Sequence, residues 1–557
     1  MFLISIISTI ILINYSSANE ILDLNLPSEH IPQYFFNFPN IRKECEDSSD
    51  CPYKEFINVT SCWGYEFGCT DQNVLSKPSC PGDHRGWVKD KKTQIETFRY
   101  QGDFGYVKEQ RDELKVICAP TFAHDSSLEC SQYLRFCRAR NVIVDFSSLI
   151  KRKEPVRYHM DVLSEGQIGG HCDFNYSLLM ENLEHHSPLQ SWAPELKNFR
   201  RVESVPGLGD MCDVYIDKPT FFMKIDATVN MYHHFCDFVN LYISLHVNSS
   251  HPQAFSSDVH ILIWETYPYS SQFEPVFKAF SKHPIWDLNK FQGKKVCFRN
   301  LVLPLLPRMI YGLYYNTPLI QGCEKSAMFE AFSKFILHRL NISKFSEQNS
   351  LPFIESEPEI TYNNKEIKNK TINLKRFEEN YDQNSKLRIT LLSRETKYRR
   401  ILNEDELLTE LKKDGRYIVN RVVFNRVVTF STQLSYIIET DILIGMHGAG
   451  LTHMLFLPQT SAVFELYNCE DIACYRDLAR LKGIKYITWE DPELVYKEDE
   501  GHHPDGGAHP KFTNYSFDVE EFIRLVSVAA NHVFEKKKVK GFEEIMIEKN
   551  LLRHIEL

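Results

Sequence analysis

Short apolar runs that alternate with helix-like segments constrain the fold of this chain more than any other feature of its sequence. A first series has strand-like runs at 221–226, 259–264 and 296–303 and helix-like segments at 231–247 and 324–340. A second series, with helical patterns between most of its members, has strand-like runs at 387–392, 417–424, 441–446, 462–467 and 485–489. Such alternation is typical of βαβ units. The sequence therefore predicts an α/β protein with two lobes built on parallel sheets, the second of them doubly wound.

A polar segment separates the two predicted lobes. Residues 344–385 are rich in Glu, Asn, Lys and Ser and show no sustained apolar period, which is typical of a solvated insertion or linker. The chain of 557 residues also exceeds the usual domain size of about 100–200 residues. We therefore place the first lobe at 141–343, the second at 386–530 and a solvated tail at 531–557.

The cysteines indicate a third unit at the N-terminus. Of fifteen cysteines, eight precede residue 140, and turn-forming clusters such as 79–83 accompany them. Disulfides are therefore expected to hold residues 19–140 together where periodic packing is absent, and such a number of cysteines is unusual for a cytosolic enzyme. Because fifteen is odd, at least one thiol has no partner within the chain. The sequence predicts a cysteine-rich subdomain but not its pairing.

The start of the chain predicts entry into the secretory pathway. Residues 1–18 are apolar and end in small residues, with Ser16 and Ala18 at the positions of a small-x-small cleavage site. About thirteen apolar-leaning residues precede Asn14, whereas a membrane span needs about twenty, so a cleaved signal peptide is favoured over an uncleaved anchor. Six N-x-S/T sequons in the rest of the chain suit this destination, at Asn58, Asn175, Asn248, Asn341, Asn369 and Asn514.

The last residues of the chain predict its compartment, and its net charge excludes one class of partner. The last four residues, His554 to Leu557, read HIEL and differ from the HDEL retrieval signal only by Ile in place of Asp. With the signal peptide, this ending predicts residence in the lumen of the endoplasmic reticulum and binding to the retrieval receptor; an incidental helix end is the alternative. A formal net charge of -10 gives no global attraction for nucleic acid, which we exclude as a partner.

A glycine-rich turn is the sharpest candidate for a binding site. A buried strand-like run ending at Met446 leads into His447, Gly448, Ala449, Gly450 and Leu451 and then into a helical pattern. Glycines let a ligand approach the backbone N–H groups, and a helix N-terminus favours negative charge, so the turn suits a phosphate or diphosphate. A tight turn that only packs a strand against a helix is the alternative.

A basic loop supports the phosphate interpretation. Ser393 and Arg394 end the first strand-like run of the second lobe, and Arg399 follows a few residues later. Ligands gather at such strand ends in open α/β sheets, and an Arg fork can bind two phosphate oxygens. Glu465, at the end of another strand-like run, could accept hydrogen bonds from ribose hydroxyls, or it is an ordinary carboxylate at a strand terminus.

The first lobe offers a candidate base. His233 and Asp237 stand four residues apart and share a helix face, and an imidazole beside a carboxylate can accept a proton from a hydroxyl. A helix-surface ion pair is the alternative. No D-x-D motif stands near a strand end of this lobe, the nearest being Trp264-Glu265-Thr266, so no metal site is predicted. Arg394 and the glycine-rich turn would then neutralise a leaving diphosphate, with no cofactor required.

Several long segments resemble one glycosyltransferase family. They include NMYHHFCDFVNLY at 230–242, DILIGMHGAGLTHMLFLP at 441–458 and HPKFTNYSFDVEEF at 509–522. These segments, and others between about 45 and 530, are similar to a family that includes the protein O-mannose β-1,4-N-acetylglucosaminyltransferase. The resemblance implies a GT-B architecture, in which two Rossmann-like lobes face a cleft and the second binds the nucleotide.

The resemblance also implies an activity. A member of this family would transfer N-acetylglucosamine from UDP-GlcNAc, with inversion, to Ser or Thr of folded EGF-like repeats such as those of Notch-type receptors. It implies donor-binding roles for Ser393, Arg394, Arg399, Glu465 and the turn 447–451, and a base at Asp237 or His233. Transfer of GlcNAc or xylose to O-mannosyl or glycan acceptors is the competing activity, and a luminal lectin or chaperone-like protein without turnover is the alternative outside enzymes.

Overall fold

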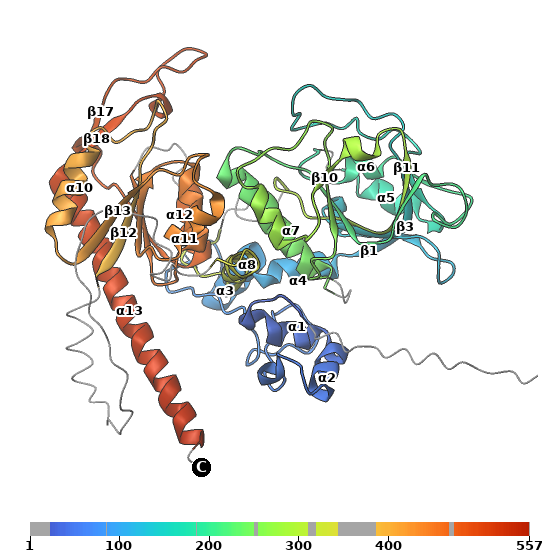
Figure 1. Ribbon diagram of the computed structural model, residues 1–557, viewed down its shortest axis with the longest axis horizontal. Coiled ribbons are helices and arrows are strands. Elements are labelled where there is room, and N and C mark those ends of the chain that lie inside the picture. The colour runs from blue at the N-terminus through green and yellow to red at the C-terminus, as the bar shows by residue number, and fades with distance from the viewer. Residues whose placement is uncertain are drawn as a thin grey trace, which may run out of the picture.

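The protein is a mixed α/β molecule with two sheets. The computed structural model describes residues 23–84, 86–184, 187–249, 254–309, 319–342, 386–466 and 473–555. An eleven-stranded sheet and a five-stranded sheet lie apart in Figure 1, with the helices α7 (Met231–Val247) and α8 (Ala327–Arg339) between them. The predicted signal peptide, the insertion 344–385 and the last two residues of the HIEL ending lie outside the described residues.

The five-stranded sheet is wholly parallel, as its apolar runs predict. Its strands are β12 (Leu387–Leu392), β13 (Tyr417–Val422), β14 (Ile442–Met446), β15 (Ala462–Leu466) and β16 (Lys485–Thr488), in the order β13-β12-β14-β15-β16. Alternate residues of a strand point to opposite faces. Leu443 accordingly joins one core cluster, whereas its neighbours Ile442 and Ile444 join the other.

Helices cover both faces of this sheet. They are α10 (Glu404–Lys413), α11 (Phe430–Ile437), the 3-10 helix η7 (Ala449–Phe456), α12 (Ala473–Lys482) and α13 (Val519–Ile555). Helix α10 begins where the sequence predicts, directly after Asn403. The side chain of Asn403 makes no capping bond to the helix and instead bonds both backbone groups of Phe517. A tertiary contact has replaced the predicted local cap.

The eleven-stranded sheet is mixed: the strands at the three predicted runs of the first lobe pair in parallel, as expected, but the sheet also contains antiparallel strands that the sequence did not predict. Its strands are β1 (Lys115–Ala119), β2 (Ser127–Cys130), β3 (Cys137–Asp145), β4 (Ile168–Gly170), β5 (Asp173–Phe174), β6 (Phe199–Arg201), β7 (Val214–Ile216), β8 (Thr220–Met223), β9 (His260–Ile263), β10 (Trp286–Asp287) and β11 (Lys295–Leu303). Strands β8 to β11 pair in parallel, but β11 pairs antiparallel with β3. Antiparallel strands need only short connections, and β1 to β3 follow one another closely in the chain.

The cysteine-rich region is continuous with this sheet. Its helices are α1 (Ile31–Asn37), α2 (Pro39–Asp47), α3 (Lys91–Gly102) and α4 (Phe104–Asp112). Strands β1 and β2, which come after these helices and also lie before residue 140, are part of the eleven-stranded sheet. Six disulfides join cysteines of the described residues: Cys45–Cys51, Cys62–Cys69, Cys80–Cys323, Cys118–Cys172, Cys130–Cys137 and Cys212–Cys297. Two of them, from Cys80 and Cys118, connect this region to residues beyond 140.

Smaller elements complete the described chain. The short helices α5 (Tyr176–Glu181) and α6 (Ala193–Leu196) lie in the first lobe, and β17 (Val495–Lys497) pairs with β18 (Tyr515–Phe517) at the end of an arm that follows β16. The single-turn 3-10 helices are η1 (Ser28–His30), η2 (Lys54–Phe56), η3 (Gln132–Leu134), η4 (Glu274–Ala279), η5 (Leu288–Phe291), η8 (Pro492–Leu494) and η9 (Pro510–Phe512).

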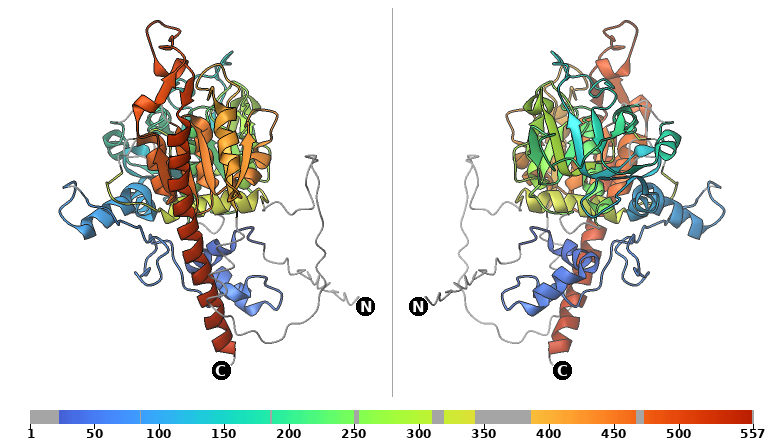
Figure 2. Two further views of the ribbon diagram at one scale, coloured as in Figure 1. Left: turned by 90° about the vertical axis from the view of Figure 1, so that its left-hand side faces the viewer. Right: turned by 90° about the vertical axis from the view of Figure 1, so that its right-hand side faces the viewer.

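The residues predicted as a terminal tail continue a helix. Helix α13 runs from Val519 to Ile555 without a break at residue 530, and Figure 2 shows it lying along the five-stranded sheet and extending beyond it. Its first half is apolar on one face, where Phe522, Leu525 and Val526 are buried. Across the described ranges, no helix has both the length and the apolar character that a bilayer crossing requires.

A continuous core joins the two sheets. The ring of Phe235, on α7, lies 5.7 Å from the ring of Phe456, on η7, and 5.7 Å from that of Phe430, on α11. Lys482 at the end of α12 bonds Glu330 of α8 at 2.6 Å. Apolar contacts and an ion pair both cross this boundary, so the elements on its two sides are packed against each other.

Candidate active site

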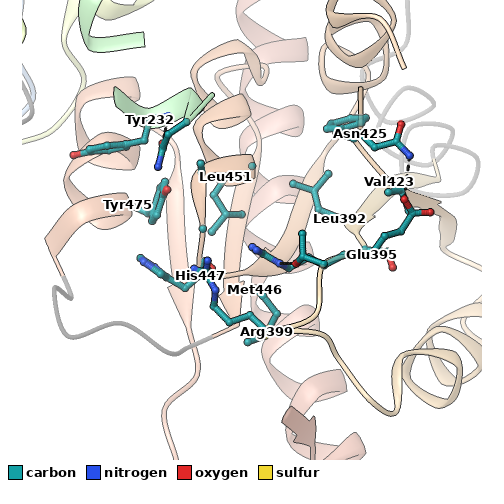
Figure 3. A pocket seen from close by; sticks show the side chains of 18 of the residues that line it. Tyr232, Leu392, Glu395, Arg399, Val423, Asn425, Met446, His447, Leu451 and Tyr475 are labelled. Atoms are coloured by element: carbon teal, nitrogen blue, oxygen red, sulfur yellow. Dashed lines mark hydrogen bonds between the residues drawn. The ribbon is translucent and has the colours of Figure 1, made fainter. Parts of the chain in front are cut away.

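A large cavity lies between the start of α7 and the carboxyl ends of β12, β13 and β14. Its volume is about 920 Å³. Second-lobe segments that line it follow those three strands, at 392–396, 423–426 and 446–451. Asn230, Tyr232 and His233 line it from the first lobe. Figure 3 shows the labelled Tyr232 and Tyr475 on one side of this cavity, with Asn425 and Glu395 on the other.

Strand order explains why a cavity forms here. In the five-stranded sheet, the chain runs from β12 outward to β13 and then returns past β12 to β14. The connections on the two sides of β12 therefore diverge, and the carboxyl edge between β12 and β14 is a topological switch point. Ligands of open α/β proteins bind at such points. The cavity thus occupies the place that the topology of a doubly wound sheet provides for a ligand.

The glycine-rich turn forms one wall of the cavity and packs against Arg394. His447, Gly448, Ala449, Gly450 and Leu451 all line the cavity, as the sequence predicts. A Cβ atom added to Gly448 would lie 2.5 Å from the Nη1 atom of Arg394, well inside contact distance. Glycine at this position therefore allows the guanidinium of Arg394 to lie on the turn.

Basic side chains surround the same wall. Arg394 and Arg399 both line the cavity, and the Nη1 group of Arg399 donates to the carbonyl oxygen of His447 at 3.0 Å. Burial and the neighbouring charge of Arg399 lower the pKa of Arg394 to about 10, so it remains charged at neutral pH. Arg426 and Lys511 also line the cavity. Two adjacent guanidinium groups and backbone N–H donors form a site complementary to a diphosphate.

Ser393 and Glu465 have positions that the sequence does not reveal. Ser393 lines the cavity, and its hydroxyl donates to Glu404 at 3.0 Å. Glu465 is buried behind the cavity rather than in its lining: its carboxylate lies 2.5 Å from His447 Nδ1 and accepts from the hydroxyl of Tyr486 at 2.7 Å. Glu465 therefore orients the ring of His447 and does not reach a ribose in this arrangement.

The first lobe contributes the start of α7. The side chain of Asn230 caps this helix by accepting from the N–H of Tyr232 at 3.0 Å and from that of His233 at 3.5 Å. The cap fixes the first turn, so Asn230, Tyr232 and His233 all face the cavity. The ring of Tyr475 lies 5.5 Å from that of Tyr232 and 5.0 Å from that of His447, and so connects the two walls.

The carboxylate beside His233 is Asp226, not Asp237 as the helix spacing predicts. The Nδ1 atom of His233 lies 3.0 Å from Asp226 Oδ2. Arg308 donates to Asp226 Oδ1 at 2.9 Å, and Arg157 pairs with the same oxygen. Burial would raise the pKa of Asp226, but the bonds from His233 and the two arginines lower it. Asp226 is therefore an anion that holds the imidazole in place.

Asp237 is part of the support under this pair. It is 2% exposed and does not line the cavity. Its carboxyl group accepts from the backbone N–H of Asp226 at 3.2 Å and lies 2.9 Å from His234 Nδ1. Burial, together with the charge of Asp226, raises the pKa of Asp237 well above its usual value. Asp237 thus fixes the loop that carries Asp226.

Several lining residues escaped the sequence interpretation. Arg426 follows β13, and the rule of strand-end loops that found Arg394 could have found it too. Lys511 comes from the arm beyond β16. Asp226, which follows β8 and pairs with His233 without lining this cavity, escaped it as well. Glu395 is the one carboxylate among the described lining residues, and it accepts from Asn425 at 3.1 Å. The walls are thus rich in cations and poor in the oxygen ligands that hold Mg²⁺.

Comparison with known proteins agrees with this geometry. The model of the glycosyltransferase 61 family matches residues 231–464, from the start of α7 to β15. The chain is 52% identical to the EGF domain-specific O-linked N-acetylglucosamine transferase of Drosophila melanogaster over 92% of this chain and 91% of that protein. It is 44% identical to the protein of the same name from Gallus gallus, over 94% of each, and 45% identical to that of Xenopus laevis, over 92% and 91%.

Identity of this degree, over at least nine tenths of each sequence, is far above what a shared fold alone produces. The residues matched by the family model, 231–464, span the first turn of α7 and the glycine-rich turn. The chain is therefore a glycosyltransferase that belongs to the family of the EGF domain-specific O-linked N-acetylglucosamine transferases.

Proposed function

We propose that this protein transfers N-acetylglucosamine from UDP-GlcNAc to Ser or Thr hydroxyls of folded EGF-like domains, including those of Notch-type receptors. The observation that carries the proposal is the cavity of about 920 Å³ between a cationic turn and a histidine–carboxylate pair. Its size is at the upper end of ligand pockets, which suits a nucleotide sugar. The names of the relatives supply the sugar and the EGF domain.

The second lobe binds the donor in this proposal. The diphosphate lies against the turn 447–451 with Arg394 and Arg399 as its counter-charges, and Arg426 and Lys511 add to the positive field. Ser393 and His447 contribute hydrogen bonds, the latter oriented by Glu465. The two lobes then have a GT-B arrangement, in which donor and acceptor approach from opposite sides of the cavity.

His233 is the proposed base. The Nδ1 atom of His233 lies 3.0 Å from Asp226 Oδ2 and 3.3 Å from Arg308 Nη2, and in this proposal the imidazole takes the proton from the acceptor hydroxyl. The acceptor oxygen bonds to the anomeric carbon of GlcNAc while the bond from that carbon to the diphosphate oxygen breaks, and UDP departs with the electron pair. A single displacement inverts the configuration. Arginines stabilise the charge on UDP, so no divalent metal is required.

The disulfides also support a cellular compartment for the protein. Six disulfides form and persist only in an oxidising compartment, and a luminal acceptor domain must meet the enzyme there. We place the protein in the lumen of the endoplasmic reticulum, retained by the retrieval receptor through HIEL.

Transfer to a defined acceptor tests the proposal. The purified protein is incubated with UDP-GlcNAc and a folded EGF-like domain, or with the same domain reduced and alkylated, or with an O-mannosyl peptide, each with and without EDTA. Intact mass should rise by one N-acetylhexosamine for the folded domain alone, and EDTA should leave the rate unchanged. Modification of the O-mannosyl peptide instead would assign the competing acceptor, and loss of transfer in EDTA would contradict the metal-free mechanism.

A further inference from the structure

A second cavity lies beside the first, in the first lobe, and has no role in the mechanism described so far. Its volume is about 350 Å³, and it opens beyond the carboxyl ends of β8 and β9. Residues from four segments line it, at 155–159, 188–189, 224–229 and 263–270. We refer to it as the side cavity.

One stretch of chain separates the side cavity from the active-site cavity. Residues 226–229 line the side cavity, whereas Asn230, Tyr232 and His233 line the active-site cavity. The partition is repeated in a second segment, because 267–270 face the side cavity and Gln272 faces the other. Residues 226–233 thus form a ridge between the two cavities, and within it His233 Nδ1 lies 3.0 Å from Asp226 Oδ2. A polypeptide that brings a hydroxyl to His233 therefore lies next to the mouth of the side cavity.

The charge of the side cavity differs from that of the donor site. Its two lining cations are already paired with carboxylates: Lys224 bonds Glu195 at 2.7 Å, and Arg157 pairs with Asp226. Glu265 adds a negative charge to the lining. A phosphate or a second nucleotide would therefore find no uncompensated positive charge here. The side cavity does not suit an anion.

Apolar side chains form most of its surface. Leu189, Ile225, Ile263 and Trp264 line it, and Val229 at its mouth is 70% exposed. A volume near the lower end of ligand pockets admits one side chain with its flanking backbone, not a whole domain. Exposure of a large apolar side chain beside an apolar cavity is typical of a surface that a partner covers.

We infer that the side cavity binds an apolar side chain of the acceptor polypeptide, in the segment that carries the reacting Ser or Thr. Docking of this side chain on one side of the 226–233 ridge would place the neighbouring hydroxyl on the other side, at His233. The site thereby selects acceptors by their sequence as well as by their fold. This inference depends on the proposed function, because it assumes that the acceptor is a polypeptide.

Two variants test the assignment from opposite directions. Ser270→Trp places a large ring at the mouth of the side cavity, and Val229→Ser removes apolar surface there. Val427→Ser is the matched control, because Val427 is 87% exposed in the second lobe and lines neither cavity. We expect KM for a folded EGF-like domain to rise about tenfold in the first two variants and to stay unchanged in the control. UDP affinity, measured by calorimetry, should stay unchanged in all three.

An acceptor series identifies the bound side chain. Each apolar residue near the modified hydroxyl is replaced by Ser in turn, and the acceptors are assayed with wild-type and Ser270→Trp protein. One replacement should raise KM with the wild type and add nothing with the variant. Wild-type KM values in both Ser270→Trp and Val229→Ser would overturn the side-cavity assignment while leaving the proposed function intact. Absence of transfer by the wild type, with UDP still bound, would instead contradict the proposed function.

Discussion

At the scale of single residues, the proposed donor site depends on positive charge that is present before any ligand binds. Arg394 lies on the glycine-rich turn and remains charged although burial and Arg399 lower its pKa to about 10. Arg400 lies only six residues further along the same loop but does not line the cavity. Replacing one or the other of these two arginines therefore distinguishes the effect of positive charge in the cavity from the effect of positive charge elsewhere on the loop.

Replacing Arg394 by Ala should weaken binding of UDP-GlcNAc about 10- to 100-fold, since charge-assisted hydrogen bonds to phosphate are lost. The Arg400→Ala protein should bind as the wild type does. Calorimetric titration with UDP measures both, and thermal unfolding confirms that each variant is folded. Equal affinities in the two variants would remove Arg394 from the donor site.

Asp226 supplies a second test at this scale. Changing it to Asn keeps its volume but removes the anion that stabilises a protonated His233. We expect kcat to fall about 100-fold, with little change in KM for UDP-GlcNAc. Asp258→Asn is the control. Asp258 forms a similar pair with His283, with 2.6 Å between Oδ1 and Nε2, and neither residue lines either cavity.

A different outcome would reassign the base. If Asp226→Asn kept the wild-type kcat while Asp237→Asn lost activity without unfolding, the carboxylate predicted from helix spacing would hold the catalytic role instead. The buried bond from Asp237 to the backbone of Asp226 makes us expect mainly a loss of stability in that variant.

At the scale of elements, the turn after β14 determines the shape of the donor wall. Gly448→Ala should displace the guanidinium of Arg394, since the added Cβ would lie 2.5 Å from Nη1. We expect donor affinity to fall about tenfold and the free energy of unfolding to fall by about 1 kcal/mol. Gly415→Ala, where nothing lies within 4 Å of the added Cβ, should leave donor affinity unchanged.

Periodicity predicted the elements of the second lobe well. The strand-like runs at 387–392 and 441–446 correspond to β12 and β14 to within one residue, because each is a buried run bounded by turn residues. The first lobe was predicted less well. Its antiparallel strands come from the cysteine-rich region, where local patterning is weak and disulfides and long-range pairing determine the structure.

The site shows the same division. Residues of the donor wall stand at strand ends, and the strand-end rule located Arg394 and the turn 447–451. The partner of His233 was not predicted: Asp226 precedes it by seven residues in a loop, whereas helix geometry favoured Asp237. Tertiary packing, which turns Asp237 into the core, decides between them.

At the scale of the whole molecule, the two lobes are held together by an ion pair that responds to pH. Glu330 of the first lobe bonds Lys482 of the second at 2.6 Å. Burial would raise the pKa of Glu330, but Lys482, with help from Lys334 and Gln459, lowers it to about 2. The folded-state pKa is thus below the unfolded value, so the stabilisation is present above about pH 4.5 and is lost as pH falls towards 2.

Glu330→Gln should therefore reduce the free energy of unfolding by about 1–3 kcal/mol at pH 7 and by almost nothing near pH 2. Denaturant unfolding of wild type and variant at a series of pH values measures the difference. An equally large difference at both ends of the series would show that Glu330 acts by packing alone.

The disulfide between Cys80 and Cys323 joins residues that are 243 positions apart. At a synthesis rate of about 5–20 residues per second, Cys80 is made roughly 12–50 seconds before its partner. Other cysteines are made before it, including Cys45, Cys51, Cys62 and Cys69. We therefore expect maturation of this enzyme to need an oxidoreductase that can undo early mispairing, and its yield to follow the redox capacity of the cell that makes it.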